Sequence, residues 1–423
     1  MKKLFALALV CTSLAQMAFA MPADTTTNKG KWGYKFSGFV ATQLFYDTRQ
    51  VVSGREDMML FYPKPQELDA NGDDINATPS LNMLSISTRL AAAFTAPDVF
   101  NAKTSAYVEG DFTGSTNDGI NMLRLRHAYI DLKWRTSELL MGQFWHPMVI
   151  HEIMPGTRPL NMGAPFHPYA RYVQTRFSQH LGNVELLGVA AFQLDNKSFG
   201  PDGSSTKYLK NSTIPELNFQ VRYQNERLFL GAAYNLLVLR PRLSVTDVWG
   251  DKYKTSTNVV SHSFTVFGKY EFPNFSLRMQ AVRADNLGEI SMLGGYIENP
   301  FDETTKTYSY KNFGCTTAWL DFGKSTGKWR PGIFLGYGIN NDFGEKLPAD
   351  AQVYGRGFEI ENLWRVQPRI AFYPSQKFGL FFEVEYTNVK YGEKQVELDN
   401  SFYYKSGYNV GNARFILSAI YNF

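Results

Sequence analysis

The last thirteen residues, GNARFILSAIYNF (411–423), decide the fold of this 423-residue chain. Going back from Phe423, every second residue is apolar or aromatic, and the residues between them include Asn422, Ser418 and Arg414. A period of two places these two sets on opposite faces of one extended strand. Chain ends of soluble proteins are usually polar and frayed. The sequence therefore predicts a terminal strand with one face in an apolar environment.

The first twenty residues, MKKLFALALVCTSLAQMAFA, have the layout of a secretory signal peptide. Lys2 and Lys3 form a positive n-region, an apolar stretch begins at Leu4, and a small-x-small cleavage motif ends at Ala20. Three polar residues interrupt the apolar stretch, whereas a membrane anchor needs about 20 predominantly apolar residues. We predict cleavage after Ala20, followed by a short periplasmic segment over residues 21–33.

Composition excludes several classes of protein. Cleavage would remove Cys11 and leave Cys315 alone, so an intramolecular disulfide is not expected. The formal net charge of +4 falls to +2 without the two signal-peptide lysines, which gives no reason to expect nucleic acid as a partner. After the signal peptide no apolar run is long enough for a transmembrane helix. An all-β barrel of this length forms a single domain.

In the rest of the chain, apolar and polar residues alternate over many short segments. The segments ELNFQVRY (216–223), LWRVQPRIAFY (363–373) and GLFFEVEYT (379–387) each carry one apolar face and one polar or charged face. Such strands have lipid or a core on one side and water on the other. We predict sixteen strands, at 34–47, 82–94, 102–112, 122–134, 137–145, 170–178, 184–194, 216–224, 228–238, 261–272, 275–283, 309–322, 329–340, 359–373, 378–390 and 411–423.

The links between these strands are unequal in a regular way. Even-numbered strands are followed by tight turns, such as NER (225–227), and odd-numbered strands by longer loops rich in Gly, Asp, Asn and Pro. Short turns at one end and long loops at the other are typical of outer-membrane barrels. The prediction is an all-β fold, a 16-stranded antiparallel transmembrane β-barrel over residues 34–423 with short periplasmic turns and long extracellular loops. The last strand must close onto the first, because an open edge would leave backbone groups unpaired in hydrocarbon.

The predicted interior is charged. A barrel of sixteen strands is too wide for side chains to fill, so we expect an aqueous channel. Charged residues inside a membrane barrel are allowed where water lines them, and they tune selectivity. The same residues could instead pair across the barrel and only stabilise it. The candidate pore-lining residues with inward parity are Arg176, Arg222, Arg365, Arg369, Arg414, Glu383 and Glu385, with Arg89, Arg278, Glu109, Asp111 and Glu185 beside them.

One long loop differs from the others. The segment HPMVIHEIMPGTRPLNMGAPFHPYA (146–170) is too apolar for a freely solvated loop, and its five prolines restrict the backbone. We expect this segment to fold back into the barrel and constrict it. The spacing of its three histidines matches no metal-binding pattern, so no metal is predicted. The candidate constriction residues are His146, His151, Glu152, Arg158 and His167.

The segments before and after this loop resemble a known family. LRLRHAYIDLKW (123–134), SELLMGQFWHP (137–147) and ARYVQTRFS (170–178) are similar to the DcaP-like family of trimeric outer-membrane porins. In that family an Arg-x-Arg-His-Ala-Tyr strand precedes a Gly-Gln-x-Trp strand and the constriction loop. The resemblance implies a homotrimer in outer-membrane lipid. It also implies that Arg124, Arg126 and Arg176 form a basic lumen favouring small anionic solutes such as carboxylates.

The parity of the strand at 122–134 leaves two possibilities open. Arg124 and Arg126 share a face with Ala128, Ile130 and Leu132 if the alternation is uninterrupted. Either a β-bulge lies within the strand, or the strand faces a neighbouring subunit instead of lipid.

Other functions are less well supported by the sequence. A barrel phospholipase needs a serine and a histidine that converge on the outer face, but His262 and Ser263 are adjacent and so point to opposite faces. A barrel of about 22 strands with a plug domain does not fit in this length. A channel for hydrophobic solutes and an adhesin or structural surface barrel stay open as alternatives. We predict no enzyme activity and no cofactor.

The first long loop contains DANGDDIN (69–76), with Asp69, Asn71 and Asp73 at calcium-like spacing. It lacks the Gly at the sixth position and the Glu at the twelfth position of a full calcium loop. A solvated turn rich in Asp and Asn is the alternative. The sequence as a whole predicts a passive diffusion porin that favours anions.

Overall fold

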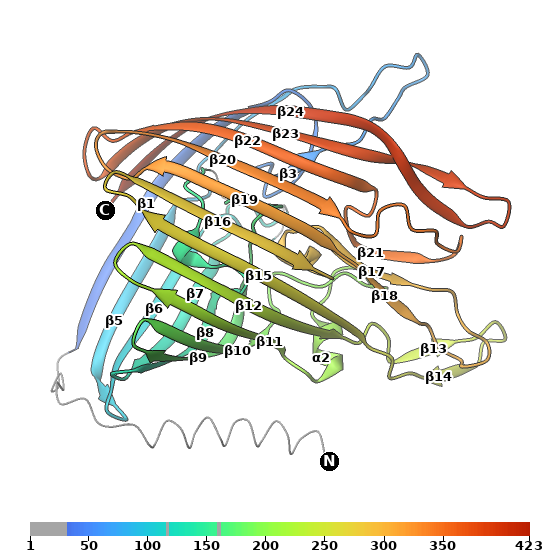
Figure 1. Ribbon diagram of the computed structural model, residues 1–423, viewed down its shortest axis with the longest axis horizontal. Helices are drawn as coiled ribbons and strands as arrows, with labels where there is room; N and C mark the ends of the chain where they lie inside the picture. The colour runs from blue at the N-terminus through green and yellow to red at the C-terminus, as the bar shows by residue number, and fades with distance from the viewer. Residues whose placement is uncertain (1–31, 116–117, 159–161) are drawn as a thin grey trace.

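The computed structural model describes residues 32–115, 118–158 and 162–423, and it shows one closed antiparallel barrel (Figure 1). β4 and β5 both pair with β1, and together they form one interrupted stave, so the barrel has sixteen staves. The predicted signal peptide and nearly all of the predicted segment 21–33 lie outside the described residues. The fold predicted from the sequence is confirmed. The staves are β1 (Gly33–Asp47), β4 (Ser80–Leu84) with β5 (Arg89–Val99), β6 (Ala102–Asp111), β7 (Arg124–Lys133), β8 (Ser137–Trp145), β9 (Arg171–Leu181), β10 (Val184–Phe192), β11 (Glu216–Gln224), β12 (Leu228–Leu239), β15 (Val259–Glu271), β16 (Phe275–Ala284), β19 (Cys315–Lys324), β20 (Trp329–Asn340), β22 (Ile360–Phe372), β23 (Phe378–Val396) and β24 (Phe402–Asn422).

Short elements lie in the loops between the staves. No helix in the described ranges is long and apolar enough to cross a membrane. The loop elements are β2 (Val51–Gly54), β3 (Met59–Pro63), β13 (Ser244–Thr246), β14 (Lys252–Lys254), β17 (Gly294–Glu298), β18 (Tyr310–Phe313), β21 (Gln352–Arg356), α2 (Lys207–Ser212), η1 (His151–Ile153) and η2 (Gly288–Ile290).

The C-terminal strand closes the barrel. β24 pairs with β1 from Phe39 opposite Asn422 to Asp47 opposite Arg414. The terminal residue continues this ladder, because the Phe423 amide donates to the Gly38 carbonyl at 3.1 Å. Closure leaves no sheet edge between the first and last staves, as hydrocarbon surroundings require.

The two ends of the barrel differ, as the loop lengths predict. Tight turns gather at one end, which we call the short-turn end, and long loops extend from the other, the long-loop end (Figure 1). β1 begins and β24 ends at the short-turn end.

Two predicted strands are interrupted. The strand at 82–94 is divided into β4 and β5, and the strand at 309–322 is divided at Gly314, because β18 leaves the barrel to pair with β17.

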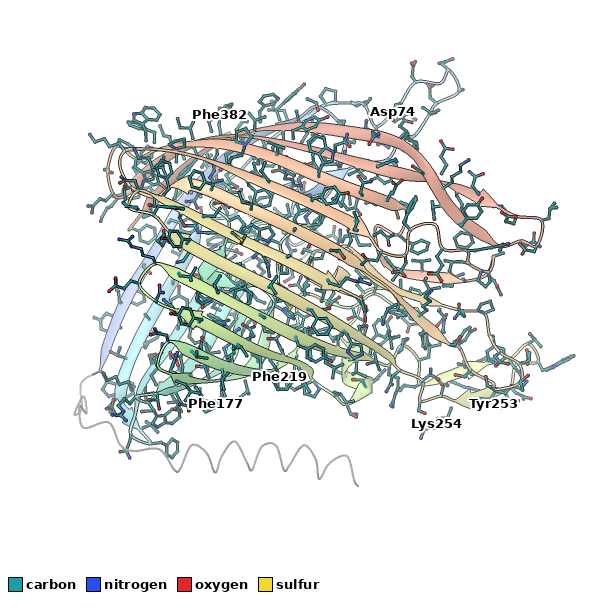
Figure 2. All side chains as sticks on the ribbon, viewed as in Figure 1. Asp74, Phe177, Phe219, Tyr253, Lys254 and Phe382 are labelled. Carbon is teal, nitrogen blue, oxygen red and sulfur yellow. The ribbon has the colours of Figure 1, made fainter. Side chains whose placement is uncertain are left out.

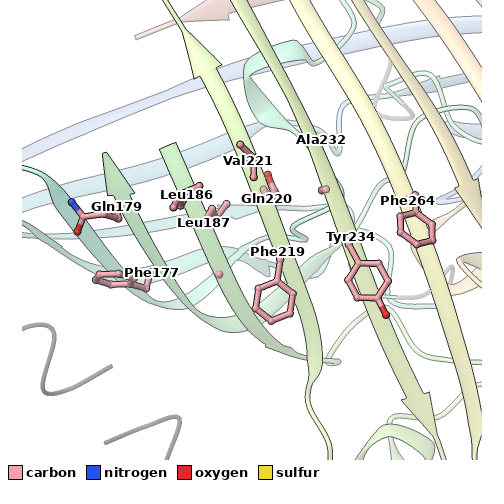
Figure 3. A pocket seen from close by; sticks show the side chains of 12 residues that line it. Phe177, Gln179, Leu186, Leu187, Phe219, Gln220, Val221, Ala232, Tyr234 and Phe264 are labelled. Atoms are coloured by element: carbon pink, nitrogen blue, oxygen red, sulfur yellow. The ribbon is translucent and has the colours of Figure 1, made fainter. Parts of the chain in front are cut away.

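The outer wall is apolar, and the size of its outward side chains varies around the barrel. Large side chains such as Phe177, Phe219 and Phe382 point outward (Figure 2). Between β9 and β15, Phe177 and Phe219 help to enclose an outward-facing groove of about 920 Å³, with Tyr234 and Phe264 on one side (Figure 3). The register of β5 to β7 instead aligns small outward residues, including Ala92, Ala96, Thr104, Ala106 and Ala128.

The interior contains an apolar core made by two inward-folded segments. One is the β2–β3 hairpin, and the other is the loop that follows β8, described over residues 146–158 and 162–170 (Figure 1). Their fully buried side chains include Met58, Ile150 and Phe166. Gly336 on the inner face of β20 makes room for this packing, because a Cβ there would lie 2.6 Å from the Phe166 ring. We call these two segments together the plug.

Candidate functional site

A bulge in β7 sets the orientation of Arg124 and Arg126. Two consecutive residues of β6 pair with His127 and Leu125, so Arg126 between them is an extra residue in its strand. Arg124 and Arg126 are both buried on the inner side, whereas Leu125 and Ile130 are exposed on the outer wall. Of the two possibilities that the sequence left open, the structure shows the bulge.

The two arginines of β7 are paired with carboxylates of the neighbouring strand. Arg124 Nη2 lies 3.0 Å from Asp111 Oδ2, and Arg126 Nη1 lies 2.6 Å from the same oxygen. Arg126 Nε also contacts Glu109 Oε1 at 2.6 Å, and Arg89 shares that carboxylate. Three guanidinium groups therefore share two carboxylates on this part of the inner wall.

Arg365 and Arg414 hold the plug against the wall. Arg365 donates to the carbonyls of Ala164 and Phe61, one in each inward segment, and lies 3.0 Å from Glu385. Its guanidinium therefore ties both segments to β22 and β23. The predicted pore-lining residues Arg365 and Glu385 are fully buried in these contacts, so the plug covers them.

The barrel seam has a similar contact. Arg414 on β24 makes a two-pronged ion pair with Asp47 on β1, with N–O distances of 2.9 and 2.7 Å. Its third nitrogen donates to the Asp57 carbonyl in the turn of the β2–β3 hairpin. Because all these groups are buried, loss of one partner would leave a charge in the interior without compensation.

Arg176 and Arg222 line the opposite side of the barrel. Arg222 Nη1 lies 2.9 Å from Glu152 in the loop and 3.5 Å from Glu185 on β10. Arg176 donates to the Trp145 carbonyl and stacks over the Phe144 ring at 5.0 Å. Glu152 is thus an anchor of the loop to the inner wall.

The loop histidines occupy separate environments. His146 Nε2 lies 2.8 Å from Glu216 Oε1, and both side chains are fully buried. Burial lowers the pKa of His167 to about 3, so that ring is neutral. Burial also lowers the pKa of His151, which lies 3.3 Å from Glu152. Within the described residues no group of three His, Cys, Asp or Glu side chains is arranged to hold a metal ion.

The calcium-like segment of the first loop forms a local turn. Asp69 Oδ1 accepts hydrogen bonds from the amides of Asn71 and Asp73 at 2.8 and 2.9 Å. Both hydrogen bonds lower the pKa of the Asp69 carboxyl, and the bond from the Asp73 amide has the larger effect. The exposed segment has the geometry of an Asx turn, which needs no ion.

A cavity of about 240 Å³ lies at the long-loop end of the interior, bordered by both inward segments. We call it the long-loop chamber. Four arginines and two acids line it, and Arg171 donates to the Tyr169 hydroxyl at 2.9 Å. Burial alone would raise the pKa of Tyr169, but the Arg171, Arg126 and Arg124 charges lower it to about 7. The ionisable residues of the chamber are Arg55, Arg124, Arg171, Arg356, Asp195, Glu289 and Tyr169.

A second cavity, of about 220 Å³, lies at the short-turn end and is called the short-turn chamber. Arg369 borders it and contacts Asp321 at 2.7 Å. Glu383 accepts hydrogen bonds from the Arg158 amide and from Gln367. Five cationic side chains and one carboxylate line the cavity, namely Arg158, Arg278, Lys324, Arg330, Arg369 and Glu383.

The structure thus gathers the predicted site residues unequally. Arg124 lines the long-loop chamber, and Arg158, Arg369 and Glu383 line the short-turn chamber, although they come from distant parts of the chain. Sequence reasoning missed Lys324 and Arg330, which flank a tight turn. It also missed the inward β2–β3 hairpin, whose signal is the apolar run MMLFY (58–62) in an otherwise polar loop.

No protein-family model matches the chain, and no curated protein matches it. Solved structures resemble it over nearly its whole length. The outer membrane channel DcaP of Acinetobacter baumannii is 16% identical with a TM-score of 0.64, covering 95% of this chain and 100% of that chain. The anion-selective porin from Comamonas acidovorans is 11% identical with a TM-score of 0.55, covering 93% and 100%. The trimer form of OmpT from Vibrio cholerae is 10% identical with a TM-score of 0.55, covering 93% and 99%.

These low identities show a shared fold. The chain has the barrel fold of outer-membrane porins.

Proposed function

We propose that this protein is a passive diffusion channel of the bacterial outer membrane that passes small hydrophilic solutes and favours anions. The observation that carries the proposal is the contrast between the two walls of the closed barrel. The outer wall is apolar, whereas ionised side chains line the inner wall and both chambers. Charged residues are tolerated inside a membrane barrel where water reaches them.

The sign of the lining charge supports a preference for anions. Nine cationic side chains and three carboxylates line the two chambers. A charged ring at the narrow part of a pore attracts the opposite charge, so this surplus favours anions. Two of the similar structures are named as an outer membrane channel and as an anion-selective porin, which agrees with the proposal. Membership of the DcaP-like family, and a preference for carboxylates, belong to the same proposal.

Assembly is proposed as a homotrimer in outer-membrane lipid after removal of a signal peptide. The outer face of β5 to β7 carries several small residues between larger apolar ones, and small residues allow close approach of subunits in membranes. A similar barrel was solved in a trimer form. The groove between β9 and β15, lined by large aromatic rings, suits acyl chains instead.

The proposal assigns no catalytic role to the chain. His262 is exposed on the outer wall, and Ser263 is buried on the inner side, so they do not form a nucleophile–base pair. The apolar side chains of the interior are packed in the plug, whereas both chambers are lined by charges. This arrangement favours hydrophilic solutes over hydrophobic ones.

The test is a planar bilayer recording with purified mature protein in a potassium chloride gradient. The proposal predicts conductance in steps of three. It also predicts a reversal potential that is shifted from zero toward the equilibrium potential of chloride. A barrel that inserts but does not conduct would overturn the channel proposal in favour of a surface or adhesive role. A cation-biased reversal potential would overturn the anion preference alone.

A further inference from the structure

The guanidinium of Arg369 lies in a cradle of three glycines at the short-turn end. A Cβ built on Gly156, Gly323 or Gly332 would lie 2.6, 2.9 or 2.7 Å from Arg369 Nη2. All three glycines therefore let the backbone pack directly against this guanidinium, and a larger residue would displace it. They come from the plug, β19 and β20, so three separate elements fix the guanidinium at the cavity wall, where the Arg369 side chain is 9% exposed.

The chamber around Arg369 has more positive charge than its carboxylates compensate. Arg369 and Arg278 share Asp321, at 2.7 and 3.4 Å. Within the described ranges, three cations of the chamber have no carboxylate within ion-pair distance, namely Arg158, Lys324 and Arg330. Arg330 is held over the Tyr373 ring at 4.2 Å, and its Nε donates to a turn carbonyl.

Two further polar groups of the chamber wall have no hydrogen-bond partner among the residues that the structure describes. Ser276 Oγ is buried, and the Ser276 side chain is only 2% exposed. Arg158 Nε is buried as well, while its guanidinium lies over the Phe381 ring at 4.6 Å. Buried donors without a partner are costly, and each such group in a native structure needs an explanation.

We propose that the short-turn chamber is a binding site for a compact oxyanion with two negative charges, of the size of phosphate. The cavity of about 220 Å³ is large enough for such an ion with a few waters. Arginine side chains bind oxyanions through charge-assisted hydrogen bonds. Arg158 and Arg330 supply donors that no carboxylate of the described ranges takes, and Arg369, whose Nη2 donates to Asp321, offers its remaining N–H groups. Lys324 adds a point charge and Ser276 a hydroxyl. This inference deepens the proposed channel function and rests on it, because the anion would enter or leave through that mouth.

The test is isothermal titration calorimetry of the full mature chain, folded in detergent, with inorganic phosphate at low ionic strength. The expected result is saturable binding that weakens as salt rises, since screening reduces charge–charge attraction. Lys324→Gln should weaken binding about tenfold, the cost of one charge-assisted contact. Lys324 has no ion pair in the described chain, so this variant should fold normally.

Two further variants complete the design. Lys254→Gln changes the same residue type on the exposed β14 hairpin, and its phosphate affinity should equal that of wild type. Arg369→Lys keeps the charge beside Asp321 but loses the planar fork, and it should weaken binding at least about threefold. Unchanged affinity in both Lys324→Gln and Arg369→Lys, or no saturable phosphate binding at all, would overturn the site. Because calorimetry needs no conduction, a barrel that conducts without binding phosphate refutes the site and leaves the channel intact.

Discussion

The two chambers on either side of the plug have similar volumes and differ in the number of carboxyl groups that line them beside their cations. In the long-loop chamber Arg124 is paired with Asp111, Arg171 bonds to Tyr169, and Asp195 and Glu289 add carboxyls. In the short-turn chamber Arg158 and Lys324 have no carboxylate partner among the described residues. Four cations are thus lined up with two carboxyl groups at the long-loop end, and five cations with one carboxyl group at the short-turn end.

The difference teaches that the number of arginines in a lumen is a poor guide to selectivity. A guanidinium fully paired with a buried carboxylate contributes little field to a passing ion, whereas an unpaired one contributes nearly its full charge. We therefore expect substitutions in the short-turn chamber to change ion preference more than those in the long-loop chamber.

Releasing the plug from the barrel wall should have the largest effect. Arg365→Ala deletes the donor that holds both inward segments and leaves Glu385 buried without its partner. The expected loss is about 3–5 kcal/mol of unfolding free energy, measured by urea unfolding in detergent, together with a higher single-channel conductance. The double variant Arg365→Ala/Glu385→Ala should regain part of the stability. Wild-type stability and conductance in Arg365→Ala would show that the plug is held in another way.

Removing uncompensated charge should have the next largest effect. Lys324→Gln/Arg330→Gln is expected to lower the ratio of anion to cation permeability by about threefold or more, because neither side chain has a carboxylate partner in the described ranges. Arg124→Gln in the long-loop chamber should change it less, since Asp111 keeps Arg126 as its partner. Reversal potentials in a salt gradient measure both. An equal or larger shift for Arg124→Gln would break the comparison.

Filling the glycine cradle should have an intermediate effect. In Gly323→Ala the new methyl would lie 2.9 Å from Arg369 Nη2, so the guanidinium must move by several tenths of an ångström. We expect phosphate affinity to fall about threefold with the barrel intact, because a displaced fork loses one of its paired hydrogen bonds. Gly188→Ala, on the outward face of β10, changes the same residue type where an added Cβ meets no atom within 4 Å. Wild-type affinity in Gly323→Ala would show that the fork's position does not matter.

The smallest expected effect is a pH response of the long-loop chamber. The pKa of Tyr169 is about 7, so its hydroxyl is neutral at pH 6 and negative at pH 8. The groups facing it are Arg171, Arg126, Arg124 and Asp111. Anion preference should therefore fall slightly as pH rises from 6 to 8, and Tyr169→Phe should remove this slope.

Glu289 needs a separate control in this experiment. Burial and the neighbouring Glu216 raise the pKa of Glu289, so its carboxyl also gains charge as pH rises. The Glu289→Gln variant should keep the slope that belongs to Tyr169. If Tyr169→Phe retains the full slope and Glu289→Gln loses it, the carboxyl is the titrating group.

Much of the fold could be predicted because the barrel is a local pattern repeated. In strands such as 216–223 and 379–387, the alternation of apolar and polar residues shows which side chains point outward and which point inward. The lengths of the connections show which end of the barrel carries the short turns. The seam also follows from the terminal strand, since a membrane allows no open edge. The break at Gly314 did not follow, because pairing of β18 with the loop strand β17 overrides alternation there. The break between β4 and β5, which both pair with β1, did not follow from the residue pattern either.

The candidate site was harder to predict for a physical reason. Its residues come from the ends of five staves and the plug, and only tertiary packing decides which of them meet. Arg365 and Arg369 have the same parity and neighbouring sequence, yet one is clamped under the plug and the other faces a cavity. Likewise, the residue pattern of the strand at 122–134 left a bulge and a subunit-facing strand both open, and only the pairing with β6 places the bulge at Arg126.

The most direct test is the block of single-channel current by inorganic phosphate added to one side at a time. Lys254→Cys on the exposed β14 hairpin, biotinylated and captured by streptavidin, identifies the compartment that the long loops face. The natural Cys315 is buried and does not compete for the label. The account predicts an anion-biased channel that phosphate blocks more strongly from the short-turn side, with the block lost in Lys324→Gln. Equal block from both sides, or stronger block from the long-loop side, would contradict it.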